Sequence, residues 1–179
     1  PEARSLRAVI TAGGTSEPLD DVRVLTNRSE GRLGAEIANA LAARGVDVTV
    51  IGSRAMLSHP GWLHPPRPAP PSGPPKGDYR AEPAAGKIRS DHAELSLSLV
   101  RPPKLLPTLR ARCPSATIIG FKLLSGVSDA ELVDVARRQV ADNQLDLSVA
   151  NDARTFVDGQ HPVVLVGPDG VRARFTGGK

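Results

Sequence analysis

The chain has 179 residues, enough for one domain with a hydrophobic core, and its formal net charge is +4. Only 3% of the residues are aromatic, so the core must be aliphatic. No basic stretch carries interleaved aromatics, which argues against a nucleic-acid partner and leaves a solvated surface or an anionic small ligand to explain the charge. The single Cys113 excludes an internal disulfide framework. With no signal-peptide pattern and no bilayer-length apolar run, we expect a cytoplasmic protein without a membrane partner.

The first predicted elements form a strand–helix–strand unit. Residues 6–15, "LRAVITAGGT", predict a short apolar strand that ends in glycines. Residues 33–45 predict a helix, with Gly45 as its left-handed end. The apolar residues of one helical face are Leu33, Ile37, Ala38 and Leu41. Residues 46–52 predict a second buried strand, and a βαβ unit implies a parallel sheet.

The second half of the chain continues the pattern with strands and one helix. Ser128 and Glu131 form a capping box at the start of the helix. The expected elements are a strand over 116–121, a helix over 128–144, a strand over 145–152 and a hairpin over 162–175 that turns at Pro168-Asp169-Gly170.

These elements predict a doubly wound, Rossmann-like α/β fold with a mostly parallel sheet and a C-terminal hairpin. Ligands of such folds bind at the carboxyl ends of the strands, where Gly13-Gly14, Phe121 and Asn151-Asp152 are expected. We expect one nucleotide-binding domain over residues 1–179, interrupted by a proline-rich segment at about 60–77. Eight of the sixteen residues from Pro60 to Pro75 are proline, so this segment cannot form a helix or a central strand, and we expect 64–77 to be poorly ordered or irregular.

Residues 94–100, "ELSLSLV", alternate strictly between polar and apolar side chains. This pattern predicts a half-exposed antiparallel strand, an arm outside the parallel sheet. Its leucines, Leu95, Leu97 and Leu99, form a stripe that must pack on the same sheet or on another subunit. We therefore expect a homodimer.

The stretch "LTNRSEGRLG", residues 25–34, precedes the first helix and holds more polar groups than a helix cap needs. A helix N-terminus offers free N–H groups to an anion, and glycines let phosphate oxygens approach. The spacing matches neither the dinucleotide fingerprint nor the P-loop, so tight turns and close packing remain an alternative explanation of the glycines. Arg23 and Asn27 favour a ligand, because neither is needed for a turn.

Three stretches in order resemble the phosphopantothenate–cysteine ligase family. They are "ITAGGTSEPLDDVRVLTNRSEGRLG" (10–34), "DYR" with "GKI" within 78–88, and "IIGFKLLSGVSDAELVDVARRQVADNQLDLSVAND" (118–152). The "GFKL" form is similar to the stand-alone ligases. The resemblance implies that CTP or ATP, with Mg²⁺, activates the carboxylate of 4'-phosphopantothenate as an acyl-nucleotide in coenzyme A biosynthesis. The amine of cysteine then attacks it and releases the nucleoside monophosphate.

The resemblance also implies roles for particular residues. Asn27 and Lys87 are implied as catalytic, and Arg23 with Asn27 as binding the substrate. The implied nucleotide-binding residues are Gly13, Gly14, Ser29, Gly31, Gly34, Asp78, Phe121, Lys122 and Asn151. No protein metal ligands are implied. The histidines lie outside every motif and are expected on the surface: His59, His64, His92 and His161.

The resemblance lapses before Asp78, where the family has a further helix and a strand that ends in an alanine-rich turn. Here the proline-rich segment takes that position, and prolines cannot supply the backbone N–H contacts of that turn. A second interpretation is therefore a nucleotide-binding homologue that has lost ligase activity. A Rossmann-type oxidoreductase is a third, although no acidic residue ends the second strand.

Overall fold

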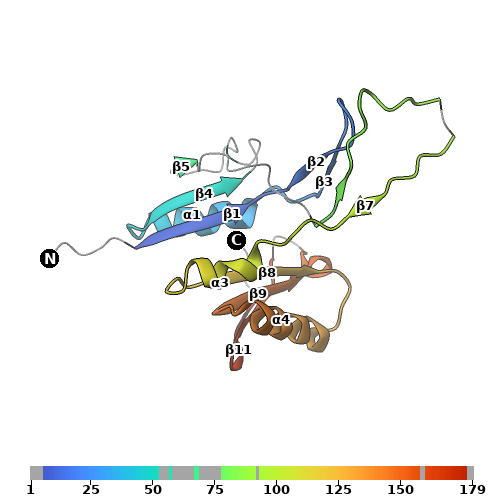
Figure 1. The fold of residues 1–179 in the computed structure, drawn as a ribbon. Helices are drawn as coiled ribbons and strands as arrows, with labels where there is room; N and C mark the ends of the chain where they lie inside the picture. Colours follow the sequence, from blue (N-terminus) through green and yellow to red (C-terminus); the bar gives the residue numbers. More distant parts are fainter. Residues whose placement is uncertain are drawn as a thin grey trace. The chain divides into compact units, whose positions relative to one another are not determined.

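The computed structural model describes residues 6–52, 57, 67–68, 78–91, 93–157 and 160–176. The chain divides into two compact units, residues 1–102 and 103–179, and each is described here by itself. Strands pair both in parallel and antiparallel, and helices pack on them (Figure 1). This confirms the expected α/β class, whereas the expectation of a single domain over 1–179 stays a prediction.

The N-terminal unit is built on a parallel sheet in the order β1-β4-β5, with strands β1 (Arg7–Ala12), β4 (Asp47–Gly52) and β5 (Arg67–Pro68). Helix α1 (Arg32–Ala42) connects β1 to β4. The predicted strand–helix–strand unit is thus confirmed, and the residue expected to end the helix, Gly45, has φ 79°.

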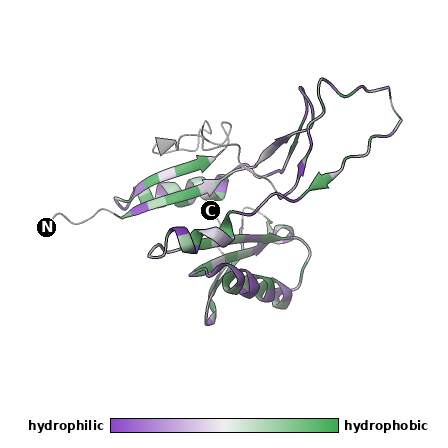
Figure 2. Cartoon of the chain, in the orientation of Figure 1, coloured by the Kyte–Doolittle hydropathy of each residue, from purple (hydrophilic) through white to green (hydrophobic). Residues whose placement is uncertain are grey.

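The core of this unit is small and aliphatic. Ala38 of α1 and Val50 of β4 are buried, and four partly buried residues pack against them: Ile10, Ala12, Val48 and Leu57. Figure 2 shows mostly hydrophobic residues along β1 and β4. Small side chains on α1 let the helix lie close to the sheet. The start of the helix therefore lies close to the end of β1.

The proline-rich segment contributes only the edge strand β5 to the described structure. Its two residues pair with Thr49 and Val50 of β4. An edge position is where a proline is tolerated, because one side of the strand needs no ladder hydrogen bonds. The other residues of 60–77, and with them the expectation of poor order at 64–77, lie outside the described residues.

Two antiparallel pairs form the remainder of the N-terminal unit. Strand β2 (Ser16–Pro18) pairs with β3 (Val24–Thr26), and β6 (Arg80–Ala81) pairs with β7 (Leu99–Val100). An antiparallel arm is thus present, but the strand expected over 94–100 is wrong in extent, because only its last two residues pair. Leu95, Leu97 and Leu99 are all exposed in the single chain.

The C-terminal unit carries a four-stranded sheet in the order β11-β10-β9-β8. Strands β8 (Ile119–Leu124) and β9 (Leu147–Asp152) are parallel, and the hairpin of β10 (Val163–Gly167) and β11 (Gly170–Phe175) adds to β9 antiparallel. The predicted C-terminal hairpin and its turn are confirmed. The short helices of this unit are η1 (Leu106–Thr108), α3 (Leu109–Arg112) and η2 (Ala153–Thr155).

Helix α4 (Asp129–Asn143) covers one face of this sheet. Its predicted cap is confirmed, because Ser128 Oγ accepts a hydrogen bond from the backbone N–H of Glu131 at 3.2 Å. The buried residues between helix and sheet are Leu132, Ala136, Ala150, Val164 and Val166. On the other face of β8, alternate residues leave Ile119, Phe121 and Leu123 exposed.

Candidate functional site

The β2–β3 hairpin lies in the chain between the carboxyl end of β1 and the start of α1, with a loop before it and a loop after it. Gly13, directly after β1, has φ 88°, and Gly31, the N-cap of α1, has φ 79°. Both angles lie in the left-handed region that favours glycine. The hydroxyl of Thr26 donates to the carbonyl oxygen of Thr15 at 2.9 Å, which ties the loop after β1 to the loop before α1.

Asn27 lies directly over Gly14. Its Oδ1 accepts a hydrogen bond from the backbone N–H of Ser29 at 3.2 Å. A Cβ at position 14 would stand 2.6 Å from that same Oδ1, so any larger residue would displace the Asn27 side chain. The structure therefore brings Gly14, Asn27 and Ser29 together, as expected from the sequence.

The N-terminus of α1 has no side-chain cap and no acidic residue in its first turn. Ser29 has the chemistry of a cap, but its N–H serves the Asn27 turn and Gly31 occupies the cap position. A Cβ at Gly34 would stand 2.3 Å from Cβ of Ala12, so glycine lets α1 start against the end of β1. Uncapped N–H groups and the positive end of the helix dipole make this turn suited to an anion.

Arg23 lies at the turn between β2 and β3. Its Nη1 donates to Oδ2 of Asp20 at 2.6 Å and to the carbonyl oxygen of Ile88 at 2.9 Å. The side chain is 39% exposed, which leaves part of the guanidinium open to solvent. Lys87, next to Ile88, is exposed, so the structure joins Arg23 to the segment that carries Lys87. Asp78, which begins this segment, is exposed as well.

Phe121 and Lys122 do not lie where the sequence placed them. Strand β8 continues to Leu124, so Phe121 is inside the strand, opposite Val149, and not at its carboxyl end. Adjacent residues of a strand point to opposite faces, so the two side chains do not share a face of the sheet. Phe121 is 49% exposed on the face away from α4. The roles of Phe121 and Lys122 as nucleotide ligands stay predictions.

Asn151 lies at the carboxyl end of β9, as expected, and is buried. Its Nδ2 lies 2.8 Å from Nε2 of His161, whose ring stacks on Phe156 with the centroids 4.0 Å apart. The expectation of His161 as a surface residue is wrong, because the residue is half-buried beside Asn151. No spacing in the sequence signals this pair, since only the return of the chain into β10 brings His161 beside β9.

Asp152, the last residue of β9, is buried and anchors three backbone N–H groups. Its carboxylate accepts hydrogen bonds from Gly126 at 2.9 Å, Val127 at 3.0 Å and Arg154 at 2.8 Å. The N–H of Arg154 contributes most to lowering the pKa of Asp152, followed by that of Gly126, and they outweigh the opposing effect of burial. This carboxylate therefore closes the loop after β8 onto the end of β9.

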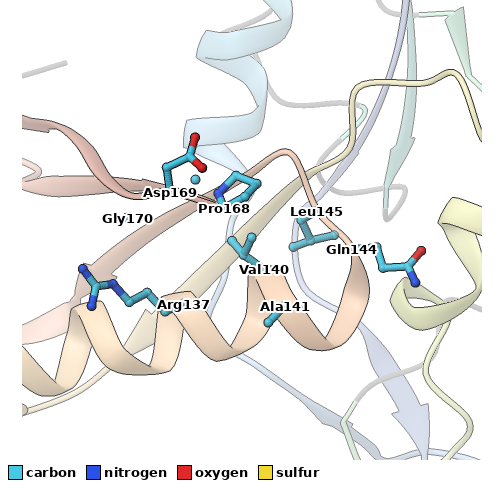
Figure 3. Close-up of a pocket in the computed structure, with 9 residues that line it drawn as sticks. Arg137, Val140, Ala141, Gln144, Leu145, Pro168, Asp169 and Gly170 are labelled. Atoms are coloured by element: carbon cyan, nitrogen blue, oxygen red, sulfur yellow. The ribbon is translucent and has the colours of Figure 1, made fainter.

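A shallow pocket of about 580 Å³ lies in the C-terminal unit, between α4 and the β10–β11 turn (Figure 3). Arg137, Val140 and Leu145 line it from one side, and Pro168 with Asp169 from the other. Because β10 runs antiparallel to β9, this turn lies at the amino end of β9, opposite the end that carries Asn151. None of the predicted site residues lines the pocket.

Within the described part of the chain, no group of three or more His, Cys, Asp or Glu side chains is placed to hold a metal ion. Mg²⁺ usually keeps several waters and takes substrate phosphates as ligands, so a nucleotide-bound Mg²⁺ does not require such a group. No helix among the described residues is long and apolar enough to cross a membrane.

The parallel strands, the glycine turn after β1 and the uncapped helix behind it define a Rossmann-like α/β protein. A model of one family of such proteins, the DNA/pantothenate metabolism flavoprotein C-terminal domain, matches residues 3–64 and 76–177. The chain belongs to this family.

A curated relative and two solved structures are similar to this chain. The coenzyme A biosynthesis bifunctional protein CoaBC of Thermococcus kodakarensis is 32% identical over 185 residues, which cover 91% of this chain and 45% of the relative. The chain thus spans less than half the length of that relative.

Among solved structures, the DNA/pantothenate metabolism flavoprotein from Streptococcus pneumoniae is 26% identical with a TM-score of 0.82, covering 96% of this chain and 93% of that one. A Cab2 variant in complex with phosphopantothenate-cysteine has a TM-score of 0.73. It is 17% identical and covers 98% of this chain and 81% of that one, a similarity that shows the fold.

Proposed function

We propose that this chain ligates 4'-phosphopantothenate to cysteine through an acyl-nucleotide, as a step of coenzyme A biosynthesis. Membership of the family supports the proposal, and so do relatives whose names give coenzyme A biosynthesis as their role. The observation that carries it is the turn of Gly14, Asn27 and Ser29 in front of an uncapped helix. This turn offers backbone and amide donors to an anion, and activation of a carboxylate by a nucleotide brings two anions together.

In this proposal the backbone at Gly13 and at residues 29–34 binds phosphate, and the amide of Asn27 holds the acyl-nucleotide. Lys87 neutralises the triphosphate or the charge that develops on it, and Arg23 contacts the phosphate of the substrate. Asp78, Phe121, Lys122 and Asn151 contribute to the nucleotide pocket. Fixed donors then stabilise the charge that develops during the reaction, and in many enzymes this stabilisation accounts for most of the rate enhancement.

The nucleotide is CTP or ATP in this proposal, and it brings Mg²⁺ into the site. When bound with the nucleotide, Mg²⁺ would shield the triphosphate charge, and the residues of the chain would orient the two reactants. No carboxylate cage is needed for a metal that takes phosphates as ligands.

We further propose that the active form is a cytoplasmic homodimer, with Leu95, Leu97 and Leu99 at or near the interface. Three exposed leucines on one short segment support this, since bare apolar stripes are costly in water. Sedimentation at micromolar concentration tests it. We expect a dimer for the chain and a monomer when the three leucines are replaced by Ser, whereas Leu105→Ser, an exposed leucine elsewhere, stays dimeric. A monomeric parent chain would refute this part.

The ligase proposal is tested by pyrophosphate release. The chain is supplied with Mg²⁺ and either CTP or ATP, with phosphopantothenate and with or without cysteine, and unphosphorylated pantothenate is the matched control substrate. We expect pyrophosphate with phosphopantothenate alone, and turnover only when cysteine is added. Nucleotide binding without pyrophosphate under any condition would refute ligation.

A further inference from the structure

Two adjacent aspartates stand in the β2–β3 turn, and the structure treats them differently. Asp21 is exposed, whereas the side chain of Asp20 is completely buried. A buried carboxylate is costly unless it is paired and hydrogen-bonded. A β-turn can form without a buried charge, so the role of the Asp20 carboxylate must be sought in its hydrogen bonds.

Asp20 makes four hydrogen bonds. Its Oδ1 accepts from the backbone N–H groups of Val22 at 2.8 Å and Arg23 at 2.7 Å. Its Oδ2 accepts from Nη1 of Arg23 at 2.6 Å and from the backbone N–H of Ile88 at 2.9 Å. The first oxygen shapes the turn, and the second reaches a residue 68 positions later in the chain.

Arg23 completes the connection from the other side. The Nη1 that pairs with Asp20 also donates to the carbonyl oxygen of Ile88 at 2.9 Å, so both polar backbone groups of Ile88 are held. A further backbone bond, from the N–H of Ala84 to the carbonyl oxygen of Leu19 at 2.9 Å, joins the same two segments. We call this set of contacts the Asp20 clamp.

The clamp requires an ionised carboxylate. Burial of Asp20 works against ionisation, but the N–H groups of Val22, Ile88 and Arg23, with the guanidinium of Arg23, lower its pKa to about 2. Because the folded pKa lies below the ordinary value of about 4, the clamp stabilises the fold at neutral pH. That contribution is lost as the pH falls from about 4 towards 2.

We propose that Asp20 is a positioning residue for Lys87. The clamp grips the residue that follows Lys87, while the Lys87 side chain itself is exposed and free to meet an anion. The residue before it, Gly86, has φ 75°, so the chain turns sharply into the clamped position. The proposal rests on the proposed function, in which Lys87 handles the triphosphate.

The first experiment tests the clamp without any reaction. Amide hydrogen exchange is followed in the full chain, in Asp20→Asn and in the control Asp21→Asn. Asn keeps the shape but loses the charge, so we expect the Ile88 amide to exchange roughly tenfold to hundredfold faster, with α4 unchanged. Unaltered exchange at Ile88 would overturn the proposal.

The second experiment asks whether Asp20 acts through Lys87. Pyrophosphate release is measured for Asp20→Asn, Lys87→Ala and the double variant. A displaced Lys87 is expected to lower kcat/KM roughly 10²-fold, with no further loss when Asp20→Asn is added to Lys87→Ala. Losses that multiply in the double variant would show that Asp20 acts independently of Lys87 and would refute the positioning role.

A third variant provides a second test of the clamp. If Asp20→Asn does not fold, as judged by circular dichroism, Arg23→Lys removes the bridge to the Ile88 carbonyl and leaves the three N–H bonds of the carboxylate. We expect faster exchange at 84–91 again, by a smaller factor, and unchanged exchange there would overturn the clamp. If the parent chain releases no pyrophosphate, the proposed function fails, while exchange at Ile88 still decides whether the clamp exists.

Discussion

Strands β1 and β9 each pair in parallel with a neighbour, but different residue types stand at their carboxyl ends. After β1 the chain uses glycine, and the backbone approaches α1 so closely that a Cβ at Gly34 would collide with Ala12. After β9 the chain uses the carboxylate of Asp152, which occupies the N–H groups of Gly126, Val127 and Arg154.

This difference separates the tasks that each end can perform. At β9 the protein's own carboxylate already satisfies nearby donors and brings negative charge, which disfavours an anion. Behind β1, helix α1 has no side-chain cap and no acidic residue in its first turn, so no side chain of the helix start neutralises the positive end of its dipole. An anionic group should therefore be held at the end of β1 rather than at the end of β9, where the carboxylate of Asp152 already serves the nearby donors.

The largest effect is expected at Asn27. Asn27→Ala should lower turnover about 10²–10³-fold while nucleotide still binds, because the proposed function assigns the phosphate contacts to backbone N–H groups. Asn27→Asp keeps an acceptor for the Ser29 N–H and loses the amide donor, so it separates the turn from the chemistry. Steady-state turnover and nucleotide titration measure both. Full activity in Asn27→Asp would leave only a turn-forming role, and an equal loss in Asn151→Ala would break the contrast between the two strand ends.

The next effect is expected at Gly14. Gly14→Ala places a methyl group 2.6 Å from Oδ1 of Asn27, so the amide must move while the helix and sheet remain. A displacement of this size in a positioned donor costs roughly 10²-fold in kcat/KM. Unchanged kcat/KM, with the thermal midpoint also unchanged, would mean that the place of Asn27 over Gly14 has no part in the reaction.

A smaller effect is expected when a glycine at a helix–sheet contact is replaced by alanine, and it should differ between the two units. Gly34→Ala meets Cβ of Ala12 at 2.3 Å and cannot be relieved by a side-chain rotation, so we expect a loss of about 1–3 kcal/mol in unfolding free energy. Gly120→Ala meets the end of Leu145 at 2.6 Å, a side chain that can rotate, and should lose less than about 1.5 kcal/mol. Urea unfolding of both variants measures the difference, and equal losses would contradict it.

The smallest expected effect is on the free energy of unfolding, and it becomes visible only when the pH is lowered. The pKa values of Asp20, Asp146 and Asp152 are all lowered, the last two mainly by backbone N–H groups, so the unfolded chain binds protons first. Stability should be constant above about pH 5 and fall as the pH drops below about 4. Urea midpoints across this range measure it, and Asp152→Asn should flatten the slope. A slope unchanged by that substitution would show that Asp152 does not contribute.

Much of the local structure could be predicted from residue order. The strand–helix–strand unit, the cap at Ser128 and the turn at Pro168-Asp169-Gly170 follow from apolar periodicity and from residues that interact within four positions. The meeting of Gly14 with Asn27 was predictable for another reason, since both residues lie on the one connection between β1 and α1. Such patterns depend on backbone geometry and short-range hydrogen bonds, which are encoded locally.

Other features depended on where distant segments meet. The strand expected over 94–100 shrinks to Leu99–Val100, because alternation supplies a face but a strand also needs a partner along its length. Asp20 reaches Ile88 across 68 positions, and Asn151 meets His161 only after the chain turns back into β10. A buried charge or a paired ring is decided by the path of the chain and the exclusion of water, which no local pattern records.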